Sequence, residues 1–130
     1  MKKIFQILLL VCAGLFLNSC YYDKFSDEII VVVPDIPDSQ VIHFTADIQP
    51  IFTSKCIGCH DSSNKINMTV GNSYNQLVPN YVIAGNADNS ILYNNLPGKN
   101  HPIQVSASNE PSIDQLALLK AWINQGAKNN

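Results

Sequence analysis

Apolar residues recur at helical spacing from about residue 44 onward and predict a series of short helices. The first is expected to begin with Thr45 or Asp47 as its cap. Pro50 has no N–H and is tolerated only in the first turn, where that donor would be unpaired, so the helix must start close to it. Its apolar face should lead toward Cys56 and meet the last helix. The face consists of Ile48, Ile51 and Phe52.

The middle of the chain alternates polar turns with two shorter helical patterns. A polar loop is expected over residues 61–67, followed by a short helix over residues 74–78 with Ser73 as its cap. A turn at residues 86–89 starts another helix over residues 90–96. The residues of that helix expected to face the interior are Ile91, Leu92 and Leu96.

The clearest predicted helix is the last one, which follows a long loop over residues 97–111. Ser112 and Gln115 have the spacing of a capping box, and Gly126 should end the helix. Trp122 is expected in the core, where the first and last helices cross. The expected helical face contains Ile113, Leu116, Ala117, Lys120 and Ile123. Together these patterns predict an all-α fold of three to five helices.

The N-terminus has the form of a secretion signal. Two lysines precede an apolar run over residues 4–17, which is too short to span a bilayer comfortably. The run ends in L-N-S-C at residues 17–20, which looks like a bacterial lipobox with Cys20 as the lipidated first residue of the mature chain. Residues 1–19 are therefore predicted to be a lipoprotein signal peptide. A plain secretory signal and an uncleaved anchor remain open.

An acidic stretch with prolines, residues 20–42, is predicted to be a tether between the anchor and a domain at residues 43–130. Its apolar run at residues 29–33 could form a short strand against the domain, so partial docking of the tether is expected. From residue 41 onward lysines and acidic residues are equal in number. A formally neutral domain has no basic patch, which argues against a nucleic-acid partner.

Residues 56–60 read C-I-G-C-H, the spacing by which a c-type haem is covalently attached and ligated. On a helix, Cys56 and Cys59 share a face and can reach one edge of the macrocycle, while His60 turns toward the iron as proximal ligand. Two other interpretations are open. A zinc site would need two more ligands, but the remaining histidines are not paired at zinc-finger spacing. A thioredoxin-like redox pair would need a βαβ context.

Three further motifs strengthen the haem interpretation: D-I-Q-P-I-F at residues 47–52, G-N-A-D-N-S-I-L-Y at residues 85–93 and W-I-N-Q-G-A at residues 122–127. With C-x-x-C-H they resemble the small class I cytochrome c domains that bacterial lipoproteins often carry. The resemblance covers residues 44–130. It implies a class I cytochrome c-like fold around one covalent haem c.

The chain departs from this family at the second iron ligand. Such domains usually carry Met-Pro-Pro there, whereas this chain reads H-P-I at residues 101–103. His101 is therefore expected as the distal ligand. Met68 is the other candidate and is expected to be a core residue, whereas His43 is expected near the start of the first helix.

The resemblance implies a membrane-tethered c-type cytochrome that carries single electrons outside the cytoplasm, in the periplasm or at the cell surface, and exchanges them with redox proteins. An electron carrier needs no small-molecule substrate and is not an enzyme. The alternatives are a haem sensor or peroxidase-like enzyme with an open distal position, and a haem module that docks on a larger oxidoreductase.

Overall fold

The structure, a computed structural model, describes Lys3, residues 32–96 and residues 100–130. The predicted signal peptide, Cys20 and most of the predicted tether lie outside the described residues. The described residues from 32 onward belong to one compact unit, Val31–Asn130. Within the part of the chain that is described, no helix is long and apolar enough to cross a membrane.

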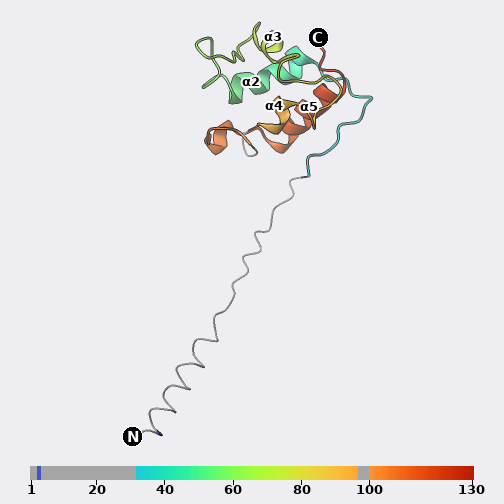
Figure 1. Cartoon of the computed structure of the whole chain (residues 1–130). Coiled ribbons are helices and arrows are strands. Elements are labelled where there is room, and N and C mark those ends of the chain that lie inside the picture. Colours follow the sequence, from blue (N-terminus) through green and yellow to red (C-terminus); the bar gives the residue numbers. More distant parts are fainter. Residues whose placement is uncertain (1–2, 4–31, 97–99) are drawn as a thin grey trace. The chain divides into compact units, whose positions relative to one another are not determined.

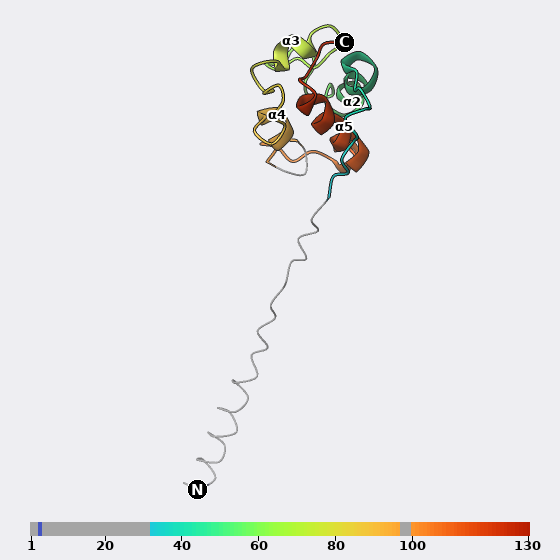
Figure 2. The ribbon, with the colours of Figure 1, turned by 90° about the vertical axis from the view of Figure 1, so that its right-hand side faces the viewer.

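The described part of this unit is built from helices and loops and contains no strand, which agrees with the predicted all-α class (Figure 1). In Figure 2, α5 runs through the middle of the unit, with α2 on one side and α3 and α4 on the other. The elements in chain order are the π-helix η1 (Phe44–Ile48), α2 (Gln49–Lys55), α3 (Ser73–Leu77), α4 (Ile91–Asn94), the 3-10 helix η2 (Ala107–Asn109) and α5 (Ile113–Asn124).

The first helical segment starts earlier than predicted. His43 occupies the N-cap position of η1, and its backbone N–H donates to the carboxylate of Asp47 over 2.7 Å. The prediction of Thr45 or Asp47 as the cap is therefore wrong, although Asp47 does satisfy a donor at this end. The earlier start brings Phe44 into the core, where it is 5% exposed. Pro50 lies in the first turn of α2, as predicted.

The core forms where η1 and α2 meet α5. Trp122 is 1% exposed, and its ring lies 5.3 Å from Phe44, measured between centroids. Phe44 also contacts Phe52 and Tyr74, at centroid distances of 6.2 and 5.2 Å. The indole N–H of Trp122 donates to the carbonyl of Lys128. The predicted positions of Trp122 and of the apolar face of the first helix are thus confirmed. The face comprises Ile48, Ile51 and Phe52, all buried.

The ends of α5 follow the prediction, but its buried face does not. Both hydrogen bonds of the capping box between Ser112 and Gln115 are present. Gly126, at φ +99°, donates to the carbonyl of Ile123 and ends the helix as expected. The buried face is rotated from the predicted one. Leu119 and Trp122 are buried, and Trp122 contacts Phe44 of η1, while Ile113 is exposed and Leu116 and Lys120 are half-buried. The buried residues are Ala117, Leu119, Trp122 and Ile123.

The two short helices differ from their predictions in detail. Ser73 is the first residue of α3 and not its cap, and its buried hydroxyl donates to the side-chain carbonyl of Gln49. The helix α4 is shorter than predicted at both ends. At its start, Ser90 is the N-cap residue, and its hydroxyl accepts from the Ile83 N–H. Ile91 is 50% exposed, contrary to the prediction. Leu92 and Leu96 are buried as expected.

Residues 35–42 lie against α5 and its C-cap residue Gln125, whereas the expected docking concerned the run at residues 29–33, most of which lies outside the described residues. Asp35 pairs with Lys120 over 3.4 Å. The side-chain amide of Gln125 donates to the carbonyl of Gln40 and accepts from the N–H of Ile42, each over 2.9 Å. Of the apolar run at residues 29–33, only residues 32 and 33 are described, and they are not in a strand.

Candidate haem-attachment site

The C-x-x-C-H motif begins where α2 ends. Cys56 is the C-cap residue of α2, and its N–H donates to the carbonyl of Phe52 over 2.9 Å. Its own carbonyl accepts from the N–H of Cys59 at 3.1 Å and from the N–H of His60 at 2.8 Å. The chain therefore makes one further turn after the helix. This turn joins all three functional residues of the motif through one carbonyl group.

The two cysteines have different surroundings. Cys56 is half-buried against the core, and this burial raises the pKa of its thiol from 9.0 to about 11. Cys59 is exposed to solvent, and neither cysteine is in a disulfide. Both thiols are thus free for attachment, one at the edge of the core and one at the surface.

His60 is half-buried and fixed by the loop that follows it. Its Nδ1 atom lies 3.2 Å from the carbonyl oxygen of Ile66. When Nδ1 carries the proton, it donates this hydrogen bond and leaves the lone pair of Nε2 for a metal ion. The loop is closed by a hydrogen bond from the Met68 N–H to the His60 carbonyl. The predicted proximal ligand therefore has one ring nitrogen satisfied by the protein.

Asp61 orders the start of this loop, residues 61–67. Its carboxylate accepts from the hydroxyl and the N–H of Ser63 and from the side-chain amide of Asn64. These hydrogen bonds, led by that of the Ser63 hydroxyl, lower the pKa of Asp61. The predicted polar loop is confirmed, and its polar residues have a local structural role.

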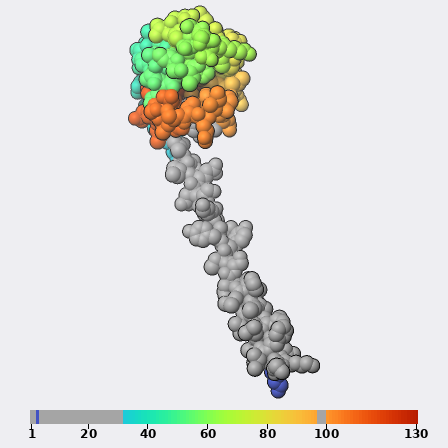
Figure 3. Space-filling view, turned by 90° about the vertical axis from the view of Figure 1, so that its left-hand side faces the viewer, coloured from blue at the N-terminus to red at the C-terminus, as the bar shows by residue number. Residues whose placement is uncertain are grey.

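His101 lies opposite His60, although 41 residues separate them in the sequence. The centroids of the two imidazole rings are 6.4 Å apart, and the ring planes are nearly perpendicular, at 86°. His101 also places Nδ1 at a backbone carbonyl, that of Ile103, over 2.7 Å. Figure 3 shows the segments around residues 57–70 (green) and 100–112 (orange) next to each other on one face.

The spacing of the two rings fits a shared metal ion. Two imidazole nitrogens, each about 2 Å from one metal ion, place their ring centroids roughly 6 Å apart. The 6.4 Å between His60 and His101 is close to this value. In both residues Nε2 is the nitrogen that the backbone leaves available. The separation of the two rings is therefore compatible with one metal ion bound by both residues.

The structure also describes Met68, the other candidate for the second ligand, and His43. The side chain of Met68 is buried among core residues, 6% exposed, which confirms its prediction as a core residue. His43 is an exposed N-cap residue, near the start of the first helix as expected.

Lys55 is a residue of this site that sequence patterns did not reveal. Its ammonium group donates to the carbonyl of Ser108, in the loop that carries His101, over 2.7 Å. A lysine in the last turn of a helix is common because it interacts favourably with the helix dipole, so its presence before Cys56 carries no specific signal. The acceptor is a backbone carbonyl, and because every residue has one, the sequence does not indicate which residue provides it.

Two surface hollows lie away from the motif, between residues 34–42 and α5. Their volumes are about 370 and 340 Å³, and neither is lined by a residue of the motif. Within the ranges 32–96 and 100–130, no group of three or more His, Cys, Asp or Glu residues is placed to hold a metal ion. His60 and His101 are only two residues, so this finding does not bear on them.

No protein-family model, curated protein or solved structure matches this chain significantly.

Proposed function

We propose that this chain is a membrane-tethered c-type cytochrome that carries single electrons outside the cytoplasm. One haem c would be bound covalently by Cys56 and Cys59, with His60 and His101 as axial ligands to its iron. The observation that carries the proposal is the 6.4 Å separation of the His60 and His101 rings, which come from different loops. This adds a geometric argument to the C-x-x-C-H spacing.

The protein would position both ligands through its backbone. The carbonyls of Ile66 and Ile103 orient the two imidazoles and select the tautomer that leaves Nε2 free. Haem supplies a one-electron couple, and with both axial positions filled it exchanges electrons without binding a substrate. The role of the chain is therefore to exclude other ligands and to set the potential, and no enzymatic activity is proposed.

The proposed partners are redox proteins that approach the exposed side of the motif, where Cys59 lies. From residue 41 onward the chain is formally neutral, so the association should depend little on salt. The proposed location is a bacterial membrane surface, periplasmic or external, with Cys20 as the lipidated residue. The L-N-S-C sequence at residues 17–20 supports this part.

The covalent attachment is tested with the double variant Cys56→Ala/Cys59→Ala. Denatured wild type should retain haem stain on a gel, whereas the double variant should lose it, because the other cysteine of the proposed mature chain, Cys20, would carry the lipid. Cys12→Ala is the matched control, since this cysteine lies in the predicted signal peptide, and it should keep the stain. Haem stain that survives in the double variant would overturn the proposal.

The anchor is tested separately with Cys20→Ala. The variant should move from the membrane fraction to the soluble fraction, because acyl chains contribute about 0.8 kcal/mol per buried methylene and are lost with the cysteine. A variant that still sediments with membranes would show that Cys20 is not the anchor.

A further inference from the structure

The loop that carries His101 has few anchors of its own. No residue between His101 and Asn109 is buried, and Ile103 is 71% exposed. Most hydrogen bonds of this stretch stay within it, as between Ser106 and Ser108 or from the Asn109 N–H to the Ser106 carbonyl. Such bonds shape the loop but do not place it against the rest of the molecule.

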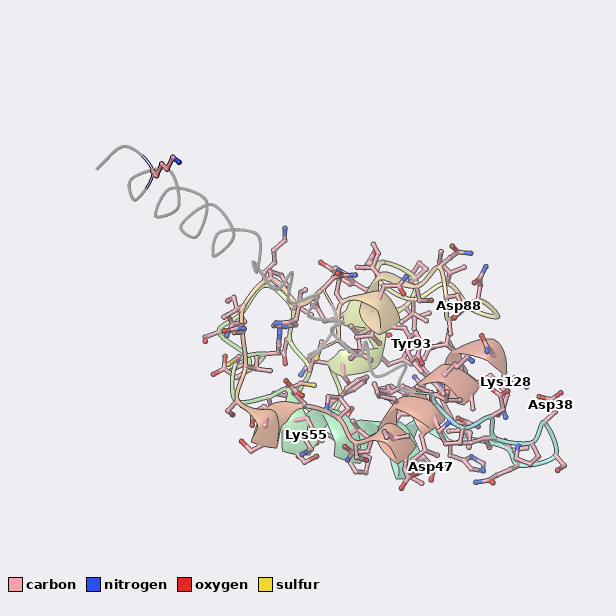
Figure 4. All side chains as sticks on the ribbon, turned by 90° about the horizontal axis from the view of Figure 1, so that it is seen from below. Asp38, Asp47, Lys55, Asp88, Tyr93 and Lys128 are labelled. Atoms are coloured by element: carbon pink, nitrogen blue, oxygen red, sulfur yellow. The ribbon has the colours of Figure 1, made fainter. Side chains whose placement is uncertain are left out.

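Among the described residues, one hydrogen bond ties this loop to a helix outside it. Lys55, the last residue of α2, donates from its ammonium group to the carbonyl of Ser108 in η2, over 2.7 Å. Figure 4 shows Lys55 at the end of α2 beside η2. The helix is a firm base for this contact, because Ile51 and Phe52 on the same helix are buried in the core.

Through its position in the chain, Lys55 links the His101 loop to the C-x-x-C-H motif. It directly precedes Cys56, so the residue that holds the His101 loop belongs to the same helix that presents the haem motif. A hydrogen bond with a charged donor is stronger than one between neutral groups. The contact therefore links the two segments that bear the proposed axial ligands.

We propose that Lys55 is a positioning residue for the second axial ligand, His101. Its hydrogen bond to the Ser108 carbonyl in η2 keeps His101 opposite His60. The inference rests on the proposed function and extends it to the control of ligation. Without this contact, the loop would spend more time away from the iron, and the distal position would open to external ligands.

The experiment compares three variants of the full-length holoprotein: Lys55→Met, Lys55→Arg and Lys65→Met. Lys65 is an exposed lysine of the loop after His60, and within the described part of the chain no hydrogen bond joins it to residues 101–109. Its variant therefore matches the loss of one positive charge. The first readout is the rate at which cyanide binds to the oxidised protein, because this rate depends on how often the distal position opens. It should rise about three- to tenfold in Lys55→Met, as expected for the loss of one hydrogen bond at an exposed position. Lys65→Met should behave like the wild type, and Lys55→Arg should restore most of the difference.

The second readout is amide hydrogen exchange of residues 100–110, which does not depend on the iron chemistry. Exchange there should be faster in Lys55→Met than in Lys65→Met. If the wild type is six-coordinate and the two methionine variants agree in both readouts, the role of Lys55 is refuted while the proposed function stands. If the wild type carries no covalent haem, the proposed function fails, and the role of Lys55 in ligation fails with it.

Discussion

The crossing of η1, α2 and α5 and the two loops that bear the histidines are built in different ways. The crossing is apolar and closed, with Ile48, Phe52 and Trp122 at most 1% exposed. The loops instead rely on hydrogen bonds to backbone carbonyls, such as those at His60 and His101. Packing therefore sets the stability of the fold, and a small number of polar contacts sets the geometry of the site. Substitutions in the two regions should have separable effects.

The largest effect on stability is expected from Trp122→Ala. The side chain is buried in the aromatic cluster and donates a hydrogen bond to the carbonyl of Lys128. Its removal should lower the free energy of unfolding by about 3–5 kcal/mol. Urea denaturation followed by circular dichroism measures this. A loss below about 1 kcal/mol would mean that the crossing is not the centre of the core.

A substitution in the loop region should change the midpoint potential and the spectrum of the proposed haem more than the stability of the fold. His101→Met replaces the expected imidazole ligand by the thioether that is usual in the class I cytochrome c domains that the motifs resemble. Methionine–histidine ligation raises the midpoint potential of a cytochrome c, so the potential of the variant should be higher than that of the wild type. Redox titration measures the shift, and the charge-transfer band of a sulfur-ligated ferric haem should appear. An unchanged potential and spectrum would place residue 101 away from the iron.

A smaller effect is expected at the start of α5. Ser112→Ala removes the hydroxyl that accepts from the N–H of Gln115 in the capping box. The free energy of unfolding should fall by about 1 kcal/mol, with no change in the haem spectrum. Ser62→Ala, in an exposed loop position, is the control. A changed spectrum in Ser112→Ala would show that the two regions are coupled through α5.

Local signals in the sequence predicted the ends of elements well. The capping box at Ser112, the stop at Gly126 and the place of Pro50 in a first turn all depend on neighbours within a few residues, and each is present. The same locality explains the errors. The face of α5 is set by where η1 lies, and the start of η1 is set by the burial of Phe44, and both depend on contacts between distant parts of the chain.

The candidate site shows the same division. The spacing of the C-x-x-C-H motif alone predicted three residues of the site, Cys56, Cys59 and His60. His101 came from its place in a family pattern, and the 6.4 Å between the rings was not deducible from the sequence. Lys55 could not be foreseen, because its partner is a carbonyl group far along the chain.

The central claim, that His60 and His101 together ligate one haem iron, is tested most directly by the optical spectrum of the purified wild-type holoprotein. The spectrum is recorded oxidised and then reduced, with and without carbon monoxide. The claim predicts a low-spin spectrum without a sulfur charge-transfer band, and a reduced form that carbon monoxide does not change in a static spectrum. A high-spin wild type that binds carbon monoxide at once would contradict it. That result would leave His101 unbound and favour a haem sensor or a peroxidase-like enzyme.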